Sequence, residues 1–180
     1  MKRIVGDPSR CLACRTCELA CALAHAGQGG QDDLVEAIFH QKAKARIYIE
    51  SAGALAVPLQ CRHCEDAPCV RVCPSGALWR PDEGGPVLVD AQRCIGCAFC
   101  VEVCPFGVIR LARRAGVGAS ESGLAVVKCD LCEARQSAGM GPACVDSCPV
   151  GALAFQEVEE NAKRTRARTA MKIAADGQLS

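Results

Sequence analysis

Hydrophobic residues occur along this chain in short runs separated by charged or glycine-rich stretches. Residues 46–50 alternate between apolar and polar side chains, as a half-exposed strand does, and residues 56–60 predict its antiparallel partner. Residues 86–90 and 124–128 predict two further strands. From Glu157 the chain predicts a terminal helix, because acidic side chains come first and basic ones follow, which suits the helix dipole. The pattern predicts an α+β protein built from short elements.

Three polar or glycine-rich stretches predict surface segments. Residues 27–31 are rich in glycine and glutamine and predict a turn, after which Asp32 or Asp33 is suited to cap a short helix. Residues 113–122 predict a polar loop, and residues 138–142 predict another.

The composition gives this chain little material for a conventional core. Only 3% of its 180 residues are aromatic, whereas 16 are cysteine, so metals or disulfides are expected to replace part of the packing. Residues 1–8 contain no apolar run of signal-peptide length, which favours a reduced, cytoplasmic location and therefore metals. No apolar run is long enough to cross a membrane. Trp79, the one tryptophan, is expected to pack in the core.

Several classes of function are disfavoured. The net charge of +1 provides no basic field for nucleic acid. The glycine-rich stretches at residues 27–30 and 116–118 fit neither a dinucleotide-binding loop nor a P-loop. No arrangement of nucleophile and base can be argued, since the cysteines are all accounted for below. We therefore expect a non-catalytic protein.

The cysteines fall into four quartets with none left over. The first and third have the spacing C-x2-C-x2-C-x3-C, the second opens its middle gap to four residues, and the fourth opens it to eleven. Such spacing is typical of iron-sulfur binding. In chain order the quartets are Cys11, Cys14, Cys17 and Cys21; Cys61, Cys64, Cys69 and Cys73; Cys94, Cys97, Cys100 and Cys104; and Cys129, Cys132, Cys144 and Cys148.

An internal repeat follows three of the quartets. In each, the last cysteine is followed by proline and then, two residues later, by glycine, which indicates duplication of a ferredoxin-like half. Because proline is tolerated in the first turn of a helix, we expect a short helix to begin at each last cysteine. The first quartet lacks this proline, so its helix is expected to continue for a further turn or two. The repeated residues are Pro74 with Gly76, Pro105 with Gly107, and Pro149 with Gly151.

Other uses of these cysteines explain the pattern less well. Structural zinc sites usually join two Cys-x-x-Cys pairs through a longer spacer than these compact quartets have. A thioredoxin-like redox pair would use two of the 16 cysteines and leave the rest unassigned. His63 lies between Cys61 and Cys64, but its quartet is complete without it, so it is expected to donate a hydrogen bond to a sulfur or a carbonyl.

The quartets give the chain a resemblance to a known family. Residues 11–21, together with residues 61–64 and 68–69, look like the four-cluster ferredoxin-type electron-transfer subunits of bacterial and archaeal oxidoreductases. That family includes the iron-sulfur subunits of dimethyl sulfoxide reductase, formate dehydrogenase, formate-linked hydrogenases, carbon monoxide dehydrogenase and tungsten aldehyde oxidoreductase. The resemblance covers roughly residues 4–155.

The resemblance implies four [4Fe-4S] clusters whose ligands are exchanged between quartets. The first and fourth quartets would share two clusters, and the second and third the other two. We name the implied ligand sets site I (Cys11, Cys14, Cys17 and Cys148), site II (Cys129, Cys132, Cys144 and Cys21), site III (Cys61, Cys64, Cys69 and Cys104) and site IV (Cys94, Cys97, Cys100 and Cys73).

The implied architecture is two interlocked dicluster halves. Residues 1–30 with 113–156 would form one half and residues 61–112 the other, with residues 31–60 as a helix-and-hairpin insertion and 157–180 as a helical extension. The chain would relay single electrons between a catalytic oxidoreductase subunit and a second redox partner, without nucleic acid or membrane insertion. In the alternative, self-association through the terminal helix would build a filamentous conducting scaffold.

Overall fold

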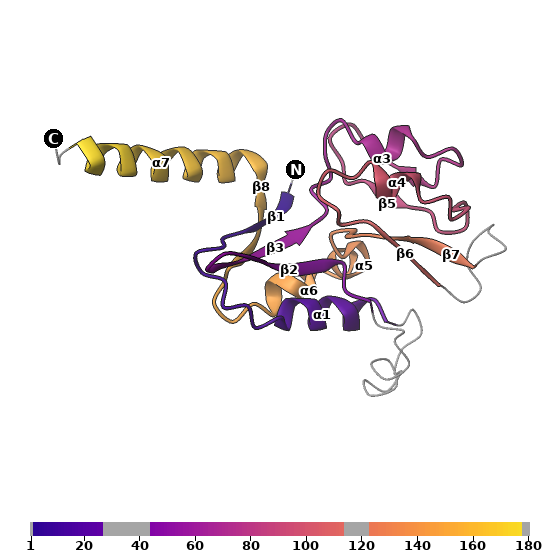
Figure 1. Cartoon of the computed structure of the whole chain (residues 1–180), viewed down its shortest axis with the longest axis horizontal. Coiled ribbons are helices and arrows are strands. Elements are labelled where there is room, and N and C mark those ends of the chain that lie inside the picture. Colours follow the sequence, from indigo (N-terminus) through magenta and orange to yellow (C-terminus); the bar gives the residue numbers. More distant parts are fainter. Residues whose placement is uncertain (1, 27–43, 114–122, 178–180) are drawn as a thin grey trace.

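Short antiparallel strand pairs and small helices form the frame of the molecule (Figure 1). The computed structural model describes residues 2–26, 44–113 and 123–177. The turn and helix predicted within residues 27–43, and most of the loop predicted at 113–122, lie outside them. The mixture of helices and strand pairs agrees with the predicted α+β class.

The strands of the described residues pair in twos. β1 (Lys2–Gly6) pairs with β8 (Leu153–Glu157), β2 (Ile47–Ala52) with β3 (Leu55–Gln60), β4 (Leu78–Trp79) with β5 (Leu88–Val89), and β6 (Arg110–Arg113) with β7 (Leu124–Val127).

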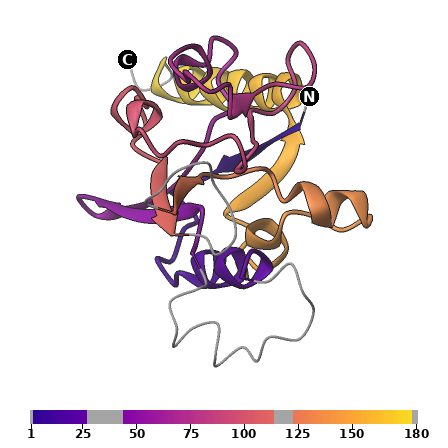
Figure 2. The same ribbon diagram turned by 90° about the vertical axis from the view of Figure 1, so that its right-hand side faces the viewer.

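The helices, except the last, are short. They are α1 (Thr16–Ala24), α3 (Pro68–Arg71), α4 (Phe99–Glu102), α5 (Glu133–Ser137), α6 (Ala143–Asp146) and α7 (Val158–Gly177). Figures 1 and 2 show α1 and α6 together below β2, and Figure 1 shows α7 projecting away from the body. None of the helices described here is both long enough and apolar enough for a membrane crossing.

The strand pairs bring distant quartets together. In the β1–β8 pair, Ile4 lies opposite Phe155, so the loop after β1 and the loop before β8 are neighbours. The loop after β1 carries Cys11 and Cys14 of the first quartet, and the loop before β8 carries Cys148 of the fourth. In the same way, Leu78 of β4 lies opposite Val89 of β5, and this pair closes the segment between the second and third quartets. The β2–β3 hairpin confirms the strands predicted at residues 46–50 and 56–60.

Cysteine side chains take much of the space in two separate cores. One core surrounds Ile4, Ile47 and Leu153 and contains cysteines of the first and fourth quartets. The other surrounds Leu78 and Ile109 and contains cysteines of the second and third quartets. This arrangement agrees with the shortage of large apolar side chains in the sequence.

Two expectations from the sequence were wrong. Each Cys-Pro step of the repeat lies after a short helix and forms a turn, as at Cys73 and Pro74, instead of starting a helix. The physical reason is that proline disfavours helical backbone in the residue before it. Cys21, which no proline follows, lies inside α1, and that helix does continue to Ala24. Trp79 is 42% exposed and does not fill the core.

Candidate metal centres

A backbone feature recurs in all four quartets. The residue before the second cysteine has a positive φ in each, although three of the four are not glycine. This conformation costs a non-glycine residue about 1–3 kcal/mol and persists only where the surroundings require it. The strain therefore indicates binding loops. The residues are Ala13 (56°), His63 (50°), Gly96 (71°) and Leu131 (60°).

Backbone N–H groups point at several of the sulfurs. The N–H of Arg46 donates to Cys21 Sγ at 3.2 Å, and the N–H of Ala152 donates to Cys148 Sγ at 3.2 Å. The N–H of Leu131 similarly donates to Cys129 Sγ at 3.4 Å. Such bonds favour thiolates, the form that binds metal.

Cavities lie at sites I and IV. One is lined by the four cysteines of site I, together with Ile49, Pro58 and Leu153. Another is lined by the four cysteines of site IV, together with Leu78 and Val126. In both, the fourth cysteine comes from a different quartet than the other three.

The cysteines of sites II and III are also brought together. Burial raises the pKa of the Cys144 thiol, and the nearby sulfurs of Cys129, Cys21 and Cys132 raise it further. Burial likewise raises the pKa of Cys69, and the sulfurs of Cys61, Cys104 and Cys64 act in the same direction.

Neighbouring sites influence one another. Besides burial and its own site, the pKa of Cys144 is raised by Cys17 of site I. Burial raises the pKa of Cys129 to about 12, and Cys61 of site III contributes. Burial raises the pKa of Cys100 to about 12, and Cys69 of site III contributes. These influences link site I to II, II to III, and III to IV.

The donor set fits iron-sulfur clusters. All sixteen cysteines are free of disulfides, and several, such as Cys17 and Cys129, are buried thiols whose pKa burial raises. A bound cation is therefore needed to keep them as thiolates.

The loop of the fourth quartet is held by a network centred on Asp130. Its carboxylate accepts the N–H of Cys132 at 2.9 Å, His25 Nε2 at 3.1 Å and the guanidinium of Arg46. Burial alone would raise the pKa of Asp130, but the hydrogen bond from His25 and the charge of Arg46 hold it well below its usual range. Asp130 therefore stays ionised.

His25 is protonated in this network. Its Nδ1 lies 2.7 Å from the carbonyl oxygen of Cys21 and its Nε2 bonds the carboxylate of Asp130, and since both partners only accept, both ring nitrogens donate. Burial opposes the charge, but hydrogen bonds with Asp130, Cys132 and Cys21 raise the pKa of His25 to about 11. Ligand atoms of His25, Asp130 and Cys132 lie within 4.8 Å of one another, but this imidazolium has no lone pair for a metal.

The comparisons with known proteins identify the family. Residues 52–158 match the 4Fe-4S dicluster domain. An iron-sulfur protein of Rhodospirillum rubrum is 42% identical over 176 residues, which cover 95% of this chain and 90% of the relative. The chain therefore belongs to the ferredoxin-type electron-transfer iron-sulfur subunits of oxidoreductases.

Two further relatives have more specific names. The electron transport protein HydN of Escherichia coli (strain K12) is 38% identical over 178 residues, which cover 93% of this chain and 97% of HydN. The thiosulfate reductase electron transfer subunit PhsB of Salmonella typhi is 39% identical over 163 residues, covering 88% of this chain and 77% of PhsB. These names agree with a non-catalytic role. A dicluster family and 16 cysteines fit two dicluster halves, and hence four [4Fe-4S] clusters.

We predict that Asp130→Asn destabilises the protein by about 1.5–3 kcal/mol, because it leaves two largely buried cations without their anion. The thermal loss of cluster absorbance under argon measures the change. Asp66→Asn is the matched control, since Asp66 pairs with Arg71 at 3.4 Å on the surface and contributes little. Equal effects of the two substitutions would contradict the structural role of Asp130.

Proposed function

We propose that this chain relays single electrons between a catalytic oxidoreductase subunit and a second redox partner. The catalytic subunit would be a tungsten or molybdenum enzyme acting on aldehyde or formate, or carbon monoxide dehydrogenase. The single observation that carries the proposal is that the cysteines of all four quartets gather in two cores, with only Cys14 and Cys97 exposed. No enzymatic activity of the chain itself is proposed. The cytoplasmic location stays a prediction.

The ligands in this proposal are the cysteines of sites I to IV as defined above. Each bound [4Fe-4S] cluster supplies a carrier that accepts one electron and returns it. The cysteines hold the iron, and their burial together with the N–H groups directed at sulfur adjusts the potential of each site. The domain limits stay as predicted, with residues 1–30 and 113–156 in one half and 61–112 in the other.

The order of the sites in the relay is I, II, III, IV. Its support is the packing of the cysteines: Cys17 and Cys144 share one core with Cys129, Cys61 of site III packs against that core, and Cys69 and Cys100 share the other core. Sites I and IV are the outer ones and contain Cys14 and Cys97, the two exposed cysteines. An electron therefore crosses the protein from one outer site to the other.

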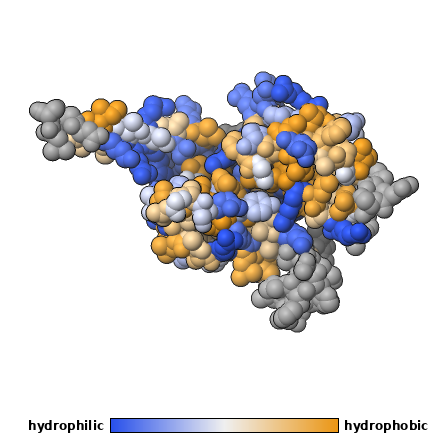
Figure 3. All heavy atoms as spheres, in the orientation of Figure 1, coloured by the Kyte–Doolittle hydropathy of each residue, from blue (hydrophilic) through white to orange (hydrophobic). Residues whose placement is uncertain are grey.

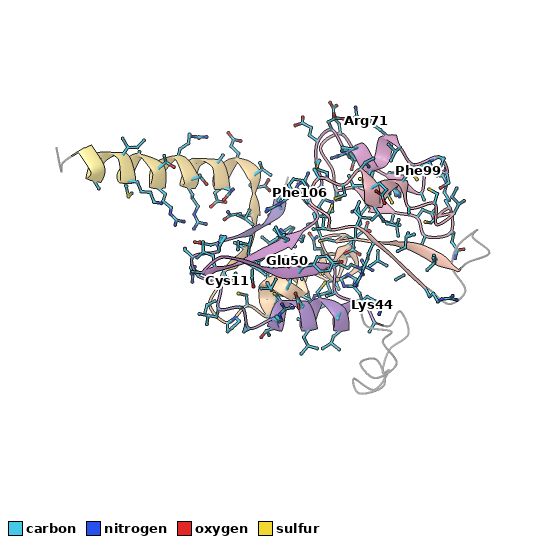
Figure 4. All side chains as sticks on the ribbon, in the orientation of Figure 1. Cys11, Lys44, Glu50, Arg71, Phe99 and Phe106 are labelled. Atoms are coloured by element: carbon cyan, nitrogen blue, oxygen red, sulfur yellow. The ribbon has the colours of Figure 1, made fainter. Side chains whose placement is uncertain are left out.

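An exposed apolar side chain lies two residues from each exposed cysteine and suits the surface for partner contact. Leu12, two residues before Cys14, is 67% exposed, and Phe99, two residues after Cys97, is 57% exposed. In Figure 4, Cys11 of site I and Phe99 lie far apart across the body. Figure 3 displays hydrophobic residues over the part that carries α3 and α4. Two separate surfaces are thus available for the two partners. The filament-forming alternative has no contact in its favour among the described residues.

The exchange of ligands between quartets predicts in which double variants the iron losses of the two single variants add. Cys14→Ala and Cys148→Ala each remove site I, so each variant should lose about four iron atoms, and the double variant no more than that. Combining Cys14→Ala with Cys97→Ala should remove two sites and about eight iron atoms. Iron and sulfide analysis after anaerobic purification measures the losses. A loss of about eight from the Cys14 and Cys148 pair would contradict the exchange.

The relay predicts a catalytic partner at an outer site. Anaerobic purification of the tagged chain from its host should recover iron together with tungsten, molybdenum or nickel. We expect either Leu12→Glu or Phe99→Glu to lose the partner's metal and keep the iron, because a buried charge opposes docking. Leu55→Glu, at a position 52% exposed on the β2–β3 hairpin, is the control and should keep both. Recovery of iron alone with the unaltered chain would count against the relay.

A further inference from the structure

Lys128 is a lysine in an unusual position. It follows strand β7 directly, and its side chain is only 2% exposed. Its Nζ donates to the carbonyl oxygen of Val87 and, at 2.8 Å, to that of Cys129. Burying an ammonium group is costly unless an anion compensates its charge.

The carbonyl partners of Lys128 belong to different cores. Val87 packs with cysteines of sites III and IV, whereas Cys129 packs with cysteines of sites I and II. His63, which is 1% exposed, also contacts this point, because its Nδ1 accepts the N–H of Val87 at 3.0 Å. The ammonium of Lys128 therefore spans the boundary between the two groups of sites.

No carboxylate pairs with Lys128 among the described residues. Asp130, two positions further on, is engaged by His25 and Arg46. The hydrogen bond to the carbonyl of Cys129 holds the ammonium beside a cysteine of site II, and the Val87 carbonyl that it also bonds belongs to the core that contains Cys69 of site III. The natural counterions of this ammonium are thus the thiolates of the two inner sites.

We propose that the fixed positive charge of Lys128 raises the reduction potentials of sites II and III together. An electron accepted at either site adds negative charge beside four thiolates, and a cation in a dry environment stabilises the added charge more than it would in water. Because the ammonium lies between the two inner sites, both gain from it, which favours passage of the electron between the halves. This inference rests on the proposed relay.

The test compares substitutions that remove or keep the charge. Lys128→Met and Lys128→Gln remove it, Lys128→Arg keeps it, and Lys172→Met removes an exposed lysine of α7 as the control. An anaerobic redox titration followed by electron paramagnetic resonance gives the midpoint potential of each one-electron step. Iron analysis of the same samples reports whether the sites are filled.

We expect two of the four steps to move to lower potential in Lys128→Met and Lys128→Gln. The expected change is about tenfold in the ratio of reduced to oxidised sites, or about 59 mV for one electron. Lys128→Arg should keep both potentials close to those of the unaltered chain, and Lys172→Met should cause no shift. The retained iron content and the Arg rescue separate a charge effect from damage to the fold.

Unchanged potentials in a neutral variant that keeps its iron would overturn the role of Lys128 and leave the relay intact. Loss of iron from both neutral variants would also overturn it, because the ammonium would then be needed for assembly instead of potential. A wild-type chain without [4Fe-4S] signals would refute the relay itself.

Discussion

Binding of iron by cysteine sulfur is the interaction on which the rest of this structure depends. The cores contain few large apolar side chains, and cysteines of all four quartets occupy their centres. The sheets are two-stranded and most helices last one or two turns, so they frame the sites without forming an independent core. Metal binding in such a protein contributes directly to folding.

Exchange of cysteines between quartets explains the topology. Strands β1 and β8 pair although they are about 150 residues apart in the sequence, which brings Cys148 to the cavity that Cys11, Cys14 and Cys17 line. The shorter β4–β5 pair does the same for Cys73 and the third quartet. Two charged residues then hold the loop of the fourth quartet: Asp130 lies between the cations of His25 and Arg46, and Lys128 bonds carbonyl groups of both cores.

The sequence alone predicts the quartets, the hairpin and the terminal helix, because spacing and alternation are local signals. It does not reveal the left-handed residues Ala13, His63 and Leu131, since nothing in their side chains demands that conformation. His25 has no partner that the sequence reveals, because Asp130 is 105 residues away along the chain. The Cys-Pro turns were mistaken for helix starts because proline is compatible with both structures.

The most direct test of this account is a count of electrons and iron on the same anaerobic sample. In a reductive titration the purified chain should take up about four electrons, one for each [4Fe-4S] cluster. Chemical analysis of the same sample should find about sixteen iron atoms and as many sulfides. Zinc in place of iron, or sulfide-free protein that still unfolds cooperatively, would contradict the assignment of the cysteines to electron-carrying clusters.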